Sequence, residues 1–140
     1  LPLAYMLPYM IAYKARGYIP MLWKVEFYKK NDGEIPVYEF LHSLPAKLQA
    51  KAFSEIELLE QCGTALKEPY AKPITGRRYQ GLWELRIRFS SDNARIFYFI
   101  FSGSTFILLH AFKKKTARTP AKELERALQY KSDYERRCQK

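Results

Sequence analysis

The residues of this sequence that could do chemistry are mainly cations on one short segment. In the run LWELRIRF, Glu84, Arg86 and Arg88 alternate with apolar residues. Because side chains alternate across a strand, these three are expected on one face of a sheet. Arg95 begins the next apolar run after a short turn. Guanidinium groups gathered on one face favour an anionic ligand.

Further cations lie on both sides of this segment. They are Arg77 and Arg78 before it and Lys113, Lys114, Lys115 and Arg118 after it. Glu84 and Asp92 are the only acids between positions 69 and 122. A surface that serves only solubility normally mixes the two signs, so this imbalance favours a functional cationic face. The alternative is a solvated sheet face with ordinary surface cations.

The second half of the chain carries the net charge. The 140 residues include 24 Lys and Arg against 14 Asp and Glu, which gives +10, and residues 1–60 are neutral overall. A polarised excess of cations indicates a polyanionic partner such as nucleic acid or the ribosome, because binding releases condensed counterions. An acidic protein partner, or no specific partner, remains an alternative.

The sequence does not indicate metal or cofactor chemistry. The candidate ligands are Cys62, Cys138, His42 and His110, and none lies close to another at the spacing of a zinc site. We therefore expect no metal, no cofactor and two reduced thiols in a cytosolic protein.

Residues 1–22 are expected to form an extension, and residues 23–140 a single domain, since this length fits one core. The extension is apolar, but Pro8, Lys14 and Arg16 interrupt it, so we predict no membrane span and no membrane partner. Its apolar side chains would pack against the domain or against a second copy, which leaves self-association open.

The remaining pattern predicts an α+β fold, with a small antiparallel sheet packed against N-terminal helices and followed by a C-terminal helix. The periodicities indicate a strand at 23–28, helices at 36–44 and 45–63, and strands at 82–89, 95–101 and 106–112. Short connections make the last three strands an antiparallel meander. Thr119 and Pro120 are expected to cap and open the final helix.

Three segments together resemble the RelE/ParE superfamily of toxin–antitoxin toxins, and most closely its HigB-like, phage-derived branch. They are GLWELRIRF, ARIFYF and LLHAFKKKTARTPAKELERA, and the resemblance runs from about residue 23 to 134. It implies a RelE-like fold and a metal-independent endoribonuclease that cuts mRNA in the ribosomal A site. It also implies a cytoplasmic protein whose partners are the ribosome, mRNA and a helix-turn-helix antitoxin.

The resemblance also implies roles for individual residues. The matching positions give catalytic candidates at Arg86, Arg95, Lys114, His110 and Tyr98, and RNA-binding candidates at Arg77, Arg78, Arg88, Lys113, Lys115 and Arg118. Arg95 is expected to contact the phosphate oxygens in the transition state. Tyr98 could instead pack. His110, which alternation places on one face with Leu108 and Phe112, could also pack.

The sequence departs from RelE-type toxins where they carry a lysine pair on the second strand. The equivalent positions here are Glu84 and Arg86. Glu84 is either a general base or a salt-bridge partner, and we favour the salt bridge.

Two other functions use the same fold or charge, namely a ParE-like toxin that binds DNA gyrase and a non-catalytic phage or nucleic-acid-binding protein. The density of cations favours RNA cleavage over gyrase binding.

Overall fold

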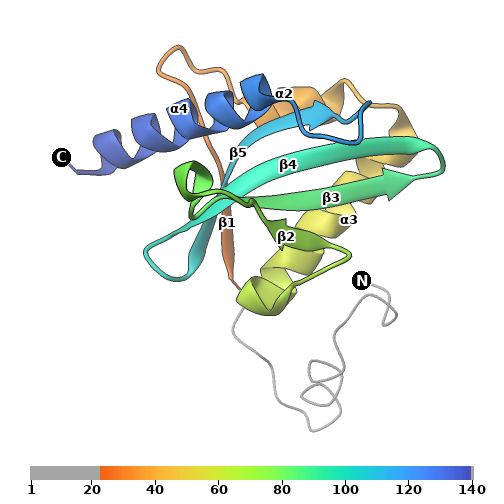
Figure 1. Ribbon diagram of the computed structural model, residues 1–140, viewed down its shortest axis with the longest axis horizontal. Coiled ribbons are helices and arrows are strands. Elements are labelled where there is room, and N and C mark those ends of the chain that lie inside the picture. Colours follow the sequence, from red (N-terminus) through yellow and green to blue (C-terminus); the bar gives the residue numbers. More distant parts are fainter. Residues whose placement is uncertain (1–22, 140) are drawn as a thin grey trace, which may run out of the picture.

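The computed structural model describes residues 23–139 (Figure 1). Five strands form one sheet in the order β1-β5-β4-β3-β2. The strands are β1 (Lys24–Phe27), β2 (Ala71–Pro73), β3 (Trp83–Phe89), β4 (Asp92–Phe101) and β5 (Thr105–Lys113). The helices are α2 (Pro36–His42), α3 (Ala46–Cys62) and α4 (Ala121–Cys138). The predicted α+β fold is confirmed. The extension at 1–22, for which the sequence leaves self-association open, lies outside the described residues.

The sheet is mixed, whereas the sequence predicts a small antiparallel sheet. The meander of β3, β4 and β5 is antiparallel as predicted, but β1 pairs with β5 in parallel. A parallel pair needs a long crossover, and here α2, α3 and the other strands supply it. The sequence pattern predicts no strand between residues 63 and 82, but this stretch contains β2, which pairs with β3 at the sheet edge, where proline is tolerated.

The two faces of the sheet carry different helices. α3 lies behind the sheet in Figure 1, and α4 crosses in front of it. The apolar stripe predicted for α3, Leu48, Ala52, Ile56 and Leu59, is buried against residues of β3 such as Leu85. The opposite face forms a second cluster, in which Leu124 and Ala127 of α4 contact aromatic residues of β4 and β5. No helix within residues 23–139 is long and apolar enough to cross a membrane.

Polar contacts attach α4 to the sheet. The Tyr28 hydroxyl donates to Asp133 at 2.6 Å, and the Tyr134 hydroxyl donates to Glu26 at 2.9 Å. The start of the helix differs from the prediction, because Pro120 is the N-cap in an extended conformation and makes no side-chain capping bond. Thr119 therefore does not cap the helix. The first turn of α4, with Ala121 and Leu124, lies close to Lys114 and Arg118 in the segment that precedes it.

Gly63 ends α3 where the chain leaves no room for a side chain. Its φ is +58°, and a Cβ would collide with the Trp23 ring. Gly81 has φ +95° with open space around it. We expect Gly63→Ala to lower the free energy of unfolding by about 1–3 kcal/mol more than Gly81→Ala, because only Gly63 adds overpacking to backbone strain. Urea unfolding followed by circular dichroism measures both, and equal losses would contradict the role of Trp23.

Candidate active site

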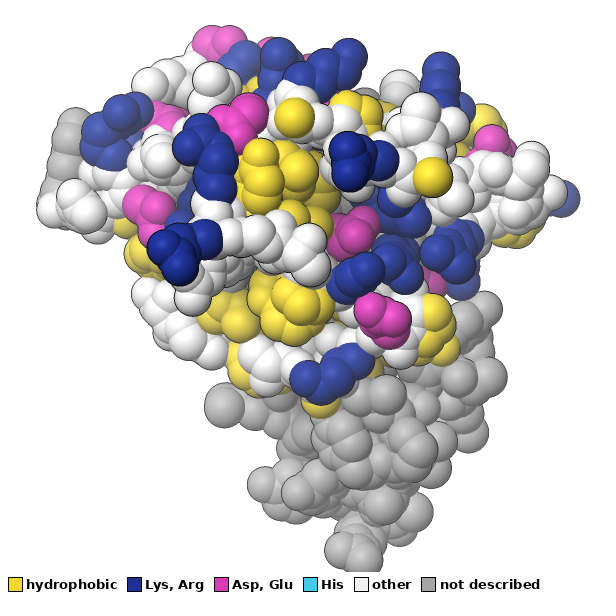
Figure 2. Space-filling view, in the orientation of Figure 1, with side chains coloured by type: hydrophobic (Ala, Val, Ile, Leu, Met, Phe, Trp, Pro, Cys, Tyr) yellow, Lys and Arg dark blue, Asp and Glu magenta, His cyan; other side chains and the backbone are white. Residues whose placement is uncertain are grey.

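A cleft of about 540 Å³ lies between the β2–β3 edge of the sheet and the segment that leads into α4. Four cations line it, namely Lys72, Arg86, Lys114 and Arg118. Glu84 is the acid in its wall. Figure 2 shows Lys and Arg side chains gathered on one part of this face around acidic side chains. The cleft therefore offers a concentrated positive potential beside a single carboxylate.

The carboxylate of Glu84 is held from behind by Arg95. Both residues are buried, with 6% and 3% of their surface exposed, and Arg95 Nε lies 2.8 Å from Glu84 Oε2. Arg95 Nη1 also donates to Asn93 Oδ1 at 2.8 Å and to the Ala94 carbonyl at 3.1 Å. The predicted salt bridge of Glu84 is confirmed. Arg95 of β4 stands directly opposite Arg86 of β3, and Glu84 lies two residues before Arg86 on the same face of β3. Glu84 and Arg95 are therefore diagonal neighbours across the two strands.

Arg95 does not line the cleft, which changes the role that the sequence suggested for it. Its guanidinium is occupied by Glu84, Asn93 and the main chain, behind the carboxylate. Burial lowers its pKa, and Glu84 acts in the opposite direction. A direct contact with a phosphate in the cleft is therefore not open to it. Arg95 therefore adjoins the cleft only through its ion pair with Glu84.

Arg86 is the guanidinium that reaches the cleft from the sheet. Its side chain is 16% exposed, and its Nη2 lies 3.9 Å from Glu84 Oε1. Its Nε is buried without a hydrogen-bond partner in the described part of the chain. Because the contact with Glu84 is as long as 3.9 Å, the terminal nitrogens of Arg86 remain available for an anionic ligand in the cleft.

Lys114 lies on the other wall of the cleft. Its main-chain N–H donates to the Asn93 carbonyl at 2.8 Å, which fixes the segment after β5 against the start of β4. Burial lowers the pKa of Lys114, and the positive charges of Arg95 and Arg86 lower it further, while Glu84 raises it. A lysine with a lowered pKa exchanges protons more readily near neutral pH.

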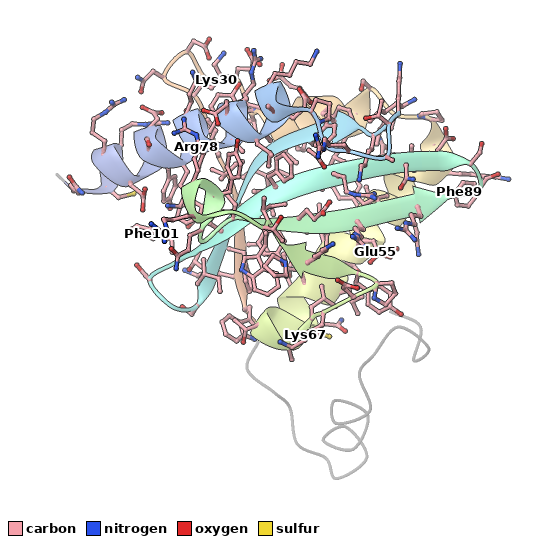
Figure 3. The ribbon with its side chains drawn as sticks, viewed as in Figure 1. Lys30, Glu55, Lys67, Arg78, Phe89 and Phe101 are labelled. Carbon is pink, nitrogen blue, oxygen red and sulfur yellow. The ribbon has the colours of Figure 1, made fainter. Side chains whose placement is uncertain are left out.

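The other predicted RNA-binding residues divide into two groups. Arg118 lines the cleft, Lys113 and Lys115 line a neighbouring hollow, and Arg88 is exposed at the end of β3. Arg77 and Arg78 do not line the cleft and lie in the turn before β3. The Nε of Arg78 donates to Glu125 of α4 at 2.8 Å, so this side chain attaches the helix. Figure 3 shows Arg78 beside α4, remote from Phe89 at the tip of the β3–β4 hairpin.

Lys72 is a cleft residue that the sequence analysis missed. It lies on β2, opposite Glu84 in the register. The sequence predicts no strand there because Pro69 and Pro73 bound the segment, and three residues are too few to show a strand periodicity. Its place beside the carboxylate follows only from the pairing of β2 with β3.

His110 does not reach the cleft. A register shift of β4 against β5 near Phe97 breaks the alternation, so Leu108 packs with the α3 cluster whereas His110 faces α4. The ring stacks on Phe112 and its Nε2 lies 3.3 Å from Glu123 Oε2. The expectation that His110 shares a face with Leu108 is therefore wrong, and a packing role is favoured.

Protonation of His110 should appear in the stability of the fold. Burial lowers the pKa of His110, although Glu123 opposes the shift. As the pH falls, the imidazole of His110 binds a proton in the unfolded chain at about pH 6.5, and in the folded protein only at lower pH. The stability that neutral His110 contributes to the fold is therefore complete above about pH 6.5 and is lost below it. We expect the wild type to lose more stability than His110→Gln between about pH 7 and 5. Urea unfolding at several pH values measures this, and parallel curves would contradict it.

Tyr98 belongs to the hydrophobic core. It is 2% exposed and lies on the α3 face, with its ring 5.5 Å from that of Phe106. Burial raises the pKa of its hydroxyl. The sequence pattern could not separate this position from a functional tyrosine, and the structure places it on the side of the sheet opposite Arg95.

Loss of the Tyr98 hydroxyl should therefore leave any RNA cleavage unchanged. We expect Tyr98→Phe to cleave within about twofold of the wild-type rate, since a side chain that cannot touch substrate contributes nothing to the barrier. Single-turnover cleavage measures the rate. A loss of a hundredfold in a variant that keeps its stability would return Tyr98 to the site.

Comparison with known proteins gives the family. The family model described as phage derived protein Gp49-like (DUF891) matches residues 39–132. The chain belongs to this family. The Gp49-like family is of the RelE/HigB toxin-like type, in agreement with the resemblance noted above, and the match includes every residue that lines the cleft. No curated protein matches the chain.

Proposed function

We propose that this Gp49-like protein is the HigB-like toxin of a toxin–antitoxin pair and that it cuts mRNA on the ribosome. The observation that supports the proposal is the cleft in which Arg86 and Lys114 face a carboxylate fixed by a buried arginine. The partners would be the ribosome, mRNA and a helix-turn-helix antitoxin, all met in the cytoplasm.

The proposed reaction uses the RNA as its own nucleophile. The 2′-oxygen attacks the adjacent phosphorus while the bond from phosphorus to the 5′-oxygen breaks, which leaves a 2′,3′-cyclic phosphate and a 5′-hydroxyl. One proton leaves the 2′-hydroxyl and another reaches the 5′-oxygen. Negative charge grows on the non-bridging oxygens in the transition state, so fixed cations near them lower the barrier.

The cleft residues fit these tasks. The salt bridge with Arg95 occupies Oε2 of Glu84, and Oε1 remains to accept the proton of the 2′-hydroxyl, so we assign both of the roles considered for Glu84 to the same side chain. Lys114 gives a proton to the 5′-oxygen, for which its lowered pKa suits it. Arg86 and Arg118 bind the non-bridging oxygens, for which the guanidinium fork is well matched. Arg95 acts only through Glu84.

The alternative functions explain less of this arrangement. A protein that merely holds nucleic acid needs surface cations but no carboxylate fixed in their midst, because a negative charge weakens phosphate binding. A gyrase-binding toxin of the ParE kind needs no cleft of this polarity. The Glu84–Arg95 pair is therefore the feature that favours catalysis.

Cleavage of a defined mRNA on purified ribosomes tests the proposal. The wild type should produce fragments with 2′,3′-cyclic phosphate ends, and Glu84→Gln should cleave about a hundredfold more slowly, because it removes the base. Lys67→Gln is the control, since Figure 3 shows this exposed lysine beyond the carboxyl end of α3. Intact mRNA with the wild type, together with inhibition of gyrase, would favour the ParE-like function instead.

A further inference from the structure

A second hollow adjoins the cleft. It has a volume of about 530 Å³ and is lined by the β3–β4 turn, the start of β4 and residues 113–117. Lys114 and Ala117 line both hollows. The two hollows therefore meet at Lys114, the residue to which we assign the proton transfer.

The second hollow carries a net positive charge. Lys113, Lys114 and Lys115 line it, against the single acid Asp92. Lys113 and Lys115 are exposed, and neither forms an ion pair within residues 23–139. Three successive lysines at the rim of a hollow create a local positive potential that attracts an anion.

Asn93 holds the second hollow in a fixed position relative to the cleft. Its carbonyl accepts the hydrogen bond of the Lys114 N–H, and its side-chain oxygen accepts one from Arg95 Nη1. One residue thus links the wall of the second hollow to the arginine that holds Glu84. A ligand that occupies both hollows would be aligned with the carboxylate without rearrangement.

We propose that the second hollow binds the nucleotide next to the scissile phosphate, so that one RNA strand crosses both hollows and its scissile phosphate lies at Lys114. The inference rests on the proposed function, whose substrate site it extends. Each hollow has the volume of an ordinary small-ligand site, and the lysines would neutralise the phosphodiester of the added nucleotide.

Binding of shortened RNAs to a lysine variant tests this path. The probe is a fluorescent 2′-O-methyl hexanucleotide, which cannot be cleaved, together with versions shortened by one nucleotide at either end. In the wild type, shortening at one end should weaken binding about tenfold. In Lys113→Gln/Lys115→Gln the same shortening should change the affinity little, because the lysine side chains that would contact the removed nucleotide are absent from this variant. The slope of log affinity against log salt should fall by about 1.4.

Lys24→Gln/Lys67→Gln is the matched control. It removes the same charge from exposed positions, and Lys24 stands opposite Thr105, about 27 Å along β5 from Lys113. This control should keep the wild-type loss of affinity on shortening and the wild-type salt slope. The proposal is overturned if the Lys113 and Lys115 variant keeps the affinity, the salt slope and the shortening effects of the wild type.

The same proteins, assayed for mRNA cleavage on ribosomes, separate this inference from the proposed function. In one outcome, the wild type cleaves mRNA, but shortening the RNA costs the same affinity in the wild type and in the Lys113 and Lys115 variant. This outcome would support the proposed nuclease and would overturn the second hollow as a nucleotide site. In the other outcome, the effect of shortening depends on the two lysines, but the wild type does not cleave mRNA. This outcome would support the RNA path and contradict the proposed nuclease activity.

Discussion

Replacement of Arg95 by methionine is expected to lower the free energy of unfolding by about 3–5 kcal/mol and to abolish cleavage. The change leaves the carboxylate of Glu84 buried without its 2.8 Å partner, and removal of one member of a buried ion pair costs about this much. Urea unfolding monitored by circular dichroism gives the stability, and cleavage on ribosomes gives the activity.

The double variant Glu84→Leu/Arg95→Met separates stability from chemistry. Removal of both charges is often neutral, because neither is then left buried alone. We expect the double variant to recover most of the stability lost by Arg95→Met and to remain inactive, since Glu84 is absent. If Arg95→Met is as stable as the wild type, the buried pair does not have the role that we assign to it.

Replacement of Arg86 by alanine is expected to slow cleavage by about 10²–10³-fold while ribosome binding weakens far less. The guanidinium faces the cleft, where charge grows on the phosphate in the transition state, and loss of one such donor typically costs this much. Ribosome binding is shared among Lys72, Lys114, Arg118 and other cations. Single-turnover cleavage and ribosome pelleting measure the two effects.

Arg86→Lys and Lys67→Ala are the companions of this experiment. Lysine keeps the charge of Arg86 but not its two-pronged geometry, so its rate should lie between those of the wild type and Arg86→Ala. Lys67 is exposed and outside the cleft, and its replacement should change neither rate nor binding. Cleavage by Arg86→Ala at the wild-type rate would place the site elsewhere.

The parts of the site that sequence could predict are those that follow from local periodicity. Alternation along β3 correctly placed Glu84 and Arg86 on one face, and the short turns correctly predicted the meander. The pairing of Glu84 with Arg95 depends on the register between strands, which alternation does not fix. A register shift misled the placement of His110, since one extra residue turns the side chains that follow it to the other face.

The parallel pairing of β1 with β5 sets the order in which the protein can fold. Lys24 and Thr105 are partners although they are 81 positions apart, whereas the strands of the meander are neighbours in the chain. Contacts over such a separation form late, because the loop entropy must be lost first. During synthesis β1 leaves the ribosome long before its partner strand, and α4, whose first turn lines the cleft, emerges after β5. A nascent chain therefore cannot complete the cleft until the first turn of α4 has left the ribosome.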